Sequence, residues 1–304
     1  MEKNLLARIN HHMEDFSKGQ KKIANYLLEH YEKSVYLTAA KLSDVVGVSE
    51  STVVRFAIEL GYDGYPRFQK ALEEIVKSEL TPRQRMELTA ERTQNKNKHP
   101  LRIIMERDAD RIHKTLNEVN YDEFDNVVKQ MTKAKKIYIL AGRSSSALGS
   151  FMYFYLNLML FDVEFVEIGS KAEIFEQLIK GGTDSLCFCI SFPRYSRRTI
   201  QGLEYAKSIG MTTISLTDSS LAPVAKLSDY MLLAKSDMIS VVDSLVGPMT
   251  IINGLLVALS LNNKEEILKN FDKLEELWNK HNIYETAYYI REAHLEGSLN
   301  KKNK

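Results

Sequence analysis

The chain has 304 residues, enough for two domains of ordinary size. Its 41 lysines and arginines exceed its 40 acids by one, which excludes a global basic field for nucleic acid and an acidic, solvated tail. Cys187 and Cys189 lie two residues apart in an apolar run, which excludes a disulfide framework and favours a reducing compartment. No apolar stretch is long enough to span a bilayer, so we expect a cytoplasmic protein with no membrane contact.

Apolar residues recur at helical spacing from Leu5 to about Lys77, without the alternation typical of strands. We therefore predict an all-helical domain over residues 1–77. The following stretch is rich in charge and amides and contains two prolines, which is typical of a linker too polar to transmit strain by packing. It leads into a further helix, so residues 78–120 are expected to connect two domains.

From Lys136 onward, short apolar runs alternate with helical stretches, which predicts a parallel sheet covered by helices on both faces. The five expected strands lie in KIYILA, VEFVEI, SLCFCISF, TTISLTD and YMLLA, and two helices follow them. The predicted fold is therefore an all-α domain joined to an α/β domain with a doubly wound parallel sheet over residues 121–280. Residues 281–304 are expected to form a C-terminal tail.

Two short helical patterns in the N-terminal domain are separated by a glycine. Residues 39–46 predict one helix, Gly47 supplies a sharp turn, and a serine two residues later can cap a second helix. This spacing is typical of a helix-turn-helix, whose second helix reaches base edges and phosphates from its N-terminal end. The residues expected to contact DNA are Ser49, Glu50, Ser51, Thr52 and Arg55.

A helical hairpin that binds no DNA would show similar spacing. Residues 1–77 hold eleven acids and eleven lysines and arginines, and this balance favours that alternative. We favour DNA binding because the glycine, the capping serine and the outward hydroxyls agree with one another.

The stretch from Leu5 to Val76 resembles the N-terminal domain of RpiR-type bacterial transcription regulators, chiefly in VSESTVVRFAIELGYDGYPRFQKAL. The α/β part resembles the sugar isomerase (SIS) domain that this family carries at its C-terminus. The resemblance implies a double-stranded DNA operator as one partner, a phosphorylated sugar or related anionic metabolite as another, and a homodimer or homotetramer. The apolar helix within residues 241–261 is a candidate subunit contact.

Ligands of a doubly wound sheet bind beyond the carboxyl ends of its strands, where AGRSSSALG and SFPRYSRRT follow the first and third strands. Serines there are common helix caps, but their hydroxyls and free backbone N–H groups can also hold a phosphate, and guanidinium groups add charge. We predict a site for a phosphorylated or carboxylated small molecule, without metal or cofactor. Its candidate residues are Arg143, Ser144, Ser145, Ser146, Ser191, Arg194, Ser196, Arg197 and Thr199.

SIS domains bind phosphosugars with a G-x-G-x-S loop and an S-G-x-T loop, and a gapless match puts Ser145 and Thr199 on their hydroxyl positions. The residues that depart from this pattern are Ala141, Arg143, Arg197 and Arg198. Arg143, at a position usually held by glycine, can either contact the anion or block the usual phosphate pose.

Two other functions are open to the sheet domain. A repressor that senses a nicotinamide dinucleotide would carry G-x-G-x-x-G after the first strand, where only Gly142 and Gly149 are found, although Glu164 and Glu167 lie about where a ribose-binding acid is expected.

A phosphosugar isomerase would need a base to move a proton. No histidine lies between residues 121 and 261, although Glu173, Glu176 and Asp243 are carboxylates in that range. We expect binding without turnover, and hence a transcription regulator whose operator binding responds to a metabolite.

Overall fold

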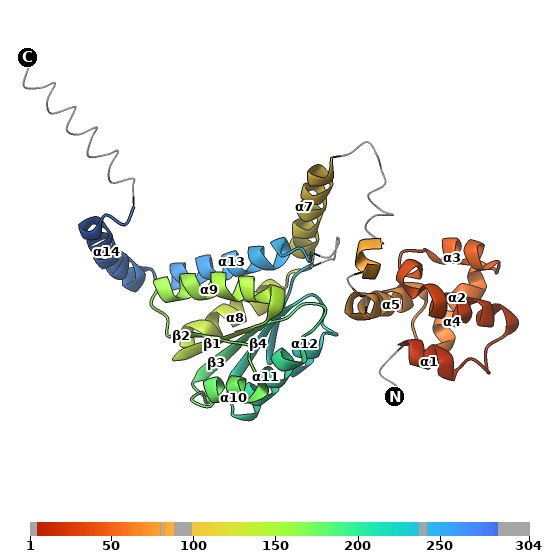
Figure 1. Cartoon of the computed structure of the whole chain (residues 1–304), viewed down its shortest axis with the longest axis horizontal. Helices are drawn as coiled ribbons and strands as arrows, with labels where there is room; N and C mark the ends of the chain where they lie inside the picture. Colours follow the sequence, from red (N-terminus) through yellow and green to blue (C-terminus); the bar gives the residue numbers. More distant parts are fainter. Residues whose placement is uncertain (1–4, 80, 82, 88–98, 237–241, 285–304) are drawn as a thin grey trace, which may run out of the picture. The chain divides into compact units, whose positions relative to one another are not determined.

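The computed structural model describes residues 5–79, 81, 83–87, 99–236 and 242–284. The chain forms two compact units (Figure 1). The first contains Met1–Arg111, Phe192–Ser196 and Ser236–Ser244, and the second contains Ile112–Ser191, Arg197–Lys235 and Leu245–Lys304. The first unit is therefore assembled from three separate segments of the chain.

The first unit contains a bundle of short helices around one apolar core. The helices are α1 (Leu5–His11), α2 (Lys18–Ser34), α3 (Ala39–Val46), α4 (Glu50–Glu59) and α5 (Tyr65–Glu79). The ring of Phe56 on α4 lies between those of Phe16 and Phe68, with centroid distances of 5.0 and 5.8 Å. All three rings are buried, so this aromatic stack fixes α4 against its neighbours.

The predicted linker holds a specific buried contact. Residues 83–87 form a helical turn, and Arg85 Nη1 donates to Asp243 Oδ1 at 3.0 Å. Arg85 is only 7% exposed, and burial raises the pKa of Asp243 above its ordinary value although Arg85 opposes this effect. The linker therefore makes a buried contact at this position, because its arginine has an ionic partner far along the chain. The expectation that it transmits no strain by packing stays a prediction.

A second polar contact joins the same segments to helix α7 (Pro100–Glu118). Asp108 Oδ1 accepts from Ser244 Oγ at 2.8 Å and from Arg111 Nη1 at 2.9 Å. Residues from the linker, from α7 and from the segment near 243 therefore share one cluster of buried or half-buried charges.

The second unit is built on a parallel sheet with the strand order β2-β1-β3-β4-β5. All four strand pairs are parallel, as predicted. The strands are β1 (Lys136–Ala141), β2 (Val163–Val166), β3 (Ser185–Ile190), β4 (Thr212–Thr217) and β5 (Tyr230–Leu233). Every residue of β3 is buried, which explains why this strand reads as a continuous apolar run.

Helices cover both faces of the sheet (Figure 1). One face carries α8 (Tyr121–Lys133), α9 (Ser146–Leu158) and α13 (Val246–Asn262), and the other carries α10 (Lys171–Leu178), α11 (Arg197–Ser208) and α12 (Pro223–Leu227). Helix α14 (Lys264–His281) follows α13 at a bend of 96°. Among the described residues, no single helix is long and apolar enough to cross a membrane, and α13 with α14 reaches that threshold only as this bent pair.

The two cysteine side chains of β3 are free thiols in the sheet core. Burial raises the pKa of Cys187 to about 12 and that of Cys189 well above its ordinary value. Because the thiolate is the reactive form, we expect Ellman's reagent at pH 8 to label neither thiol in the native protein and both after denaturation. Rapid labelling of one thiol in native buffer would contradict this placement of β3.

Candidate nucleic-acid interface and anion site

The turn between α3 and α4 has the predicted geometry. Helix α3 covers residues 39–46, and Gly47 follows with φ +69°, a left-handed conformation that glycine adopts without steric cost. Its N–H donates to the carbonyl oxygen of Ser43 at 2.9 Å. Leu42 of α3 and Val53 of α4 are fully buried, so the opposite side of α4 faces solvent.

The five residues expected to contact DNA lie together at the start of α4. Ser49, Glu50, Ser51 and Arg55 are exposed, and Thr52 is half-buried. The Ser49 hydroxyl lies 2.9 Å from that of Ser51 and 2.8 Å from that of Thr52. Arg55 donates to the carbonyl oxygen and the hydroxyl of Ser51 at 3.3 and 3.4 Å. These long bonds at the surface leave the guanidinium group able to exchange Ser51 for an external acceptor.

The expected role of Ser49 as a cap is only half right. Ser49 occupies the N-cap position of α4, but its side chain makes no capping hydrogen bond with the helix backbone. Its hydroxyl instead pairs with the two neighbouring hydroxyls, which the spacing of residue types along the sequence does not reveal.

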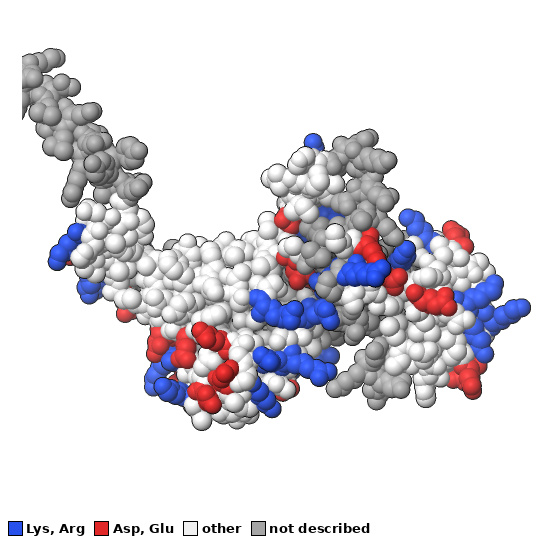
Figure 2. All heavy atoms as spheres, viewed as in Figure 1, with Lys and Arg blue, Asp and Glu red and all other residues white. Residues whose placement is uncertain are grey.

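Three exposed lysines of α2 were missed in the sequence analysis. Lys18, Lys21 and Lys22 lie in the first turns of α2. This end of α2 is close to α4, because a Cβ atom on Gly19 would lie 3.2 Å from Cγ2 of Thr52. Figure 2 shows Lys and Arg atoms along the outer edge of the helical part. The local run KGQKK was the available signal, which the neutral total for residues 1–77 concealed.

The carboxyl ends of β1 and β3 lie side by side at one edge of the sheet. The strand order changes direction between these two strands, and Ala141 pairs in register with Ile190. This is the topological switch point at which doubly wound sheets bind ligands. A Cβ atom on Gly142 would lie 3.2 Å from Oγ1 of Thr199, so the first loop directly meets the first turn of α11.

Hydroxyl groups at this junction lie at different depths. Ser145 is 4% exposed, Ser191 is equally buried and Thr199 is 1% exposed, whereas Arg143, Ser144 and Arg197 are exposed and Ser146 is half-buried. The N-termini of α9 and α11 both open at this edge, where first-turn N–H groups favour an anion. Hydroxyl groups, helix N-termini and exposed cations are therefore all found at this junction.

Arg143 has an unusual backbone conformation. Its φ of +57° lies in the left-handed region, and its carbonyl oxygen accepts from Ser146 Oγ at 2.6 Å. A residue with a side chain pays roughly 1–2 kcal/mol for this conformation, which explains why a glycine would suit the position.

The remaining arginines have different placements. Arg198 Nη1 donates to the carbonyl oxygen of Gly169 at 2.6 Å and so ties α11 to the loop before α10. Arg194 and Ser196 lie in the segment Phe192–Ser196, which belongs to the first unit. Their role beside the other loop residues stays a prediction.

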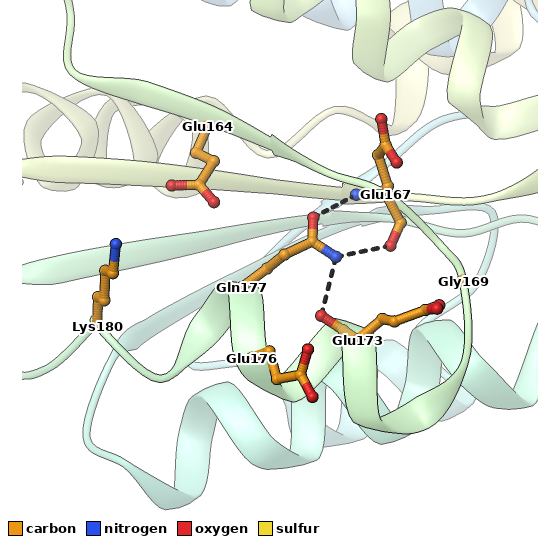
Figure 3. A pocket seen from close by; sticks show the side chains of 7 residues that line it. All are labelled: Glu164, Glu167, Gly169, Glu173, Glu176, Gln177 and Lys180. Atoms are coloured by element: carbon orange, nitrogen blue, oxygen red, sulfur yellow. Dashed lines mark hydrogen bonds between the residues drawn. The ribbon is translucent and has the colours of Figure 1, made fainter.

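An acidic hollow of about 570 Å³ lies beside the edge strand β2 (Figure 3). It is lined by Glu164, Glu167, Gly169, Glu173, Glu176, Gln177 and Lys180. Gln177 makes two hydrogen bonds with the backbone of Glu167 just after β2 (Figure 3). Its side chain accepts from the N–H of Glu167 at 2.8 Å and donates to the carbonyl oxygen of Glu167 at 3.1 Å. The excess of carboxylates makes this hollow a poor place for a phosphate.

Two of the three carboxylates considered as a base, Glu173 and Asp243, have structural partners. Glu173 and Ser170 form a capping box at the start of α10, and the bond from the Ser170 N–H lowers the pKa of Glu173. Asp243 pairs with Arg85 in the first unit. Among the described residues, no group of three or more His, Cys, Asp or Glu side chains could hold a metal ion.

A helix-turn-helix unit and a doubly wound sheet with a hydroxyl-lined switch point together define the class of helix-turn-helix proteins that carry a sugar-isomerase-type domain. Residues 3–79 match the helix-turn-helix domain of the rpiR family, and residues 130–258 match the SIS domain. The chain belongs to the RpiR-type transcription regulators, as its sequence resemblance indicated.

The chain is similar to a transcriptional regulator matched by sequence and to two solved structures. An HTH-type transcriptional regulator of Haemophilus influenzae is 25% identical over 240 residues, which cover 75% of this chain and 79% of that protein. The NanR protein of Vibrio vulnificus, solved in complex with ManNAc-6P, is 20% identical with a TM-score of 0.57 and covers 90% of this chain and 98% of its own. The sugar isomerase domain of an RpiR transcription factor from Sphaerobacter thermophilus is 24% identical with a TM-score of 0.56 and covers 59% of this chain and 99% of its own.

Proposed function

We propose that this transcription regulator binds an operator through the N-terminal end of α4. We also propose that a sugar phosphate or related anionic metabolite, bound between the loop after β1 and the first turn of α11, changes its operator affinity. The observation that carries the ligand site is the approach of Gly142 to Thr199 at the topological switch point, beside the buried hydroxyls of Ser145 and Ser191. The ManNAc-6P complex of NanR supports a phosphorylated sugar as the ligand class. Such a regulator would act in the cytoplasm, as a homodimer or homotetramer.

A thermal-shift screen tests the ligand site. A ligand present at a hundred times its dissociation constant stabilises the folded state by about 2.7 kcal/mol, and we expect a phosphosugar to raise the melting temperature by several degrees. Inorganic phosphate and the matching unphosphorylated sugars are the controls. Equal shifts with the unphosphorylated sugars, or none from a broad phosphosugar panel, would refute a phosphate-binding site.

We also propose that the bound sugar phosphate is not turned over. Glu173 serves as a helix cap, and Asp243 is paired with Arg85 at 3.0 Å, so neither of these two candidate carboxylates is held ready as a base. Incubating purified protein with the ligand found in the thermal screen should leave it unchanged. Aldose–ketose conversion that a single carboxylate substitution abolishes would favour the isomerase alternative, and stabilisation by NAD alone would favour the dinucleotide alternative.

The conformation of Arg143 gives a separate prediction. We expect Arg143→Gly to stabilise the protein by about 1 kcal/mol in urea unfolding, because glycine adopts a positive φ without strain. Ser144→Gly is the matched control, since the adjacent residue does not have a positive φ and should lose stability. Equal destabilisation by both variants would contradict the strain. The ligand affinity of Arg143→Gly then separates the two roles of this arginine, since it falls if the guanidinium contacts the anion and rises if it blocks the site.

A further inference from the structure

Helix α14 carries an apolar stripe that its own unit covers only in part, since Ile267 is buried but Phe271, Leu274 and Trp278 are half-buried. Ile267, Phe271, Leu274 and Trp278 recur at spacings of four, three and four residues, which places them on one side of the helix. Among the described residues of α14 only Ile267 is buried, and Leu268 and Leu277, which flank the stripe, are 50% and 51% exposed. Figure 1 shows α14 extending away from the sheet and the helices that pack on it.

The stripe is symmetric about the middle of the helix. Reversing α14 about the point between Asp272 and Lys273 exchanges Phe271 with Leu274 and Ile267 with Trp278. The same reversal exchanges Leu268 with Leu277. An antiparallel pair of such helices therefore brings apolar side chains opposite apolar side chains in every layer, as a self-complementary twofold contact requires.

The charges at the two ends of α14 favour the same arrangement. The first turn carries Glu265 and Glu266, and the last turn carries Lys280 and His281. In an antiparallel pair the acidic end of one helix lies beside the basic end of the other, and the two helix dipoles oppose each other. A parallel pair would instead bring like charges together.

We propose that α14 pairs antiparallel with α14 of a second copy of this chain, about a twofold axis between Asp272 and Lys273. The half-buried Phe271 then packs against the half-buried Leu274 of the second copy in the two central layers of the contact. The exposed Val257 and Leu261, near the end of α13, extend the apolar surface next to the bend. This pairing deepens the proposed function, which includes a homo-oligomer, but it requires neither DNA nor metabolite.

Sedimentation equilibrium of the full chain tests the pairing. Leu274→Glu places a charge in the centre of the contact and should weaken self-association by about a hundredfold. Asn279→Glu adds the same charge to the same helix at an exposed position outside the stripe. It only reduces the charge complementarity at the helix ends, and should weaken self-association far less. Equal association constants for the two variants would overturn the proposal.

A mixing experiment tests the antiparallel register. Phe271→Lys and Leu274→Glu should each be monomeric alone, because each variant buries a charge against an apolar side chain in both central layers. In a mixed pair the lysine of one copy faces the glutamate of the other, while the second layer keeps its native phenylalanine and leucine. We expect the mixture to associate at least about tenfold more tightly than either variant alone, since opposite charges at this distance attract. No gain on mixing would rule out this register.

Two results separate this inference from the proposed function. A Leu274→Glu variant that loses thermal stability but keeps the parent's association constant would show that the stripe is covered within its own chain, and would overturn the pairing. A parent chain that is monomeric at micromolar concentration would also overturn it, whereas the thermal shift with phosphosugars would still report ligand binding.

Discussion

Arg55→Ala is expected to lower operator affinity by about 1–3 kcal/mol, which corresponds to roughly a tenfold to hundredfold weaker complex. The guanidinium group is exposed on α4 and donates to Ser51, so its removal opens no cavity in the core. The melting temperature should therefore stay at the parental value while DNA binding falls.

Fluorescence anisotropy measures this effect with a duplex selected from a random-sequence pool, so the experiment does not depend on identifying the target genes first. The salt concentration must be fixed, because phosphate contacts make protein–DNA affinity strongly dependent on it. Arg67→Ala is the matched control, since Arg67 is also exposed in the first unit but lies on α5. Equal losses for Arg55 and Arg67 would indicate nonspecific attraction and would remove α4 from the interface.

Ser145→Ala combined with Thr199→Ala should abolish the metabolite response while sparing operator binding in the absence of metabolite. A hydrogen bond to a charged group contributes about 1.5–3 kcal/mol, so losing two such bonds should raise the midpoint of the metabolite titration about a hundredfold or more. The two side chains reach the same junction from the β1 loop and from α11.

The control for this variant must also remove a buried hydroxyl. Ser215, in the middle of β4, is fully buried, and its hydroxyl has no hydrogen-bond partner among the described residues. Ser215→Ala should therefore keep the parental response to metabolite in the same anisotropy titration. A double variant that responds with the parent's midpoint and amplitude would place the phosphate elsewhere.

Short-range patterns in the sequence predicted the helices, the glycine turn and the strands, because the conformation of these elements depends mainly on residues close in sequence. The helix over residues 39–46 and its glycine turn were found because a left-handed residue must interrupt two helices so closely spaced. The parallel sheet was found because buried strands read as apolar runs separated by helices. The order of residue types along the chain could also place the two loops after β1 and β3, since carboxyl ends of parallel strands share one edge.

Contacts between residues far apart in the sequence could not be predicted from such short-range patterns. The pair formed by Arg85 and Asp243 spans 158 positions, and nothing near either residue indicates the other. The depth of each hydroxyl was likewise hidden, because Ser144 and Ser145 are the same residue type but only Ser145 is buried. The lysines of α2 were missed because net charge was counted over a whole domain rather than over one face.

Because the first unit consists of three separate segments of the chain, the DNA-binding part cannot be separated from the rest by a single truncation without losing some of its contacts. A chain shortened to its first 111 residues would lack two of the three segments, and Arg85 would lose the carboxylate of Asp243. Removing one partner of a buried ion pair typically costs about 3–5 kcal/mol, a large share of the stability of a small domain. Fusing the N-terminal helices to a foreign sensor at the end of the linker would therefore give a weakened DNA-binding part. Any exchange of sensor domains, in the laboratory or during evolution, has to carry along the residues around 243 or replace the charge that they supply.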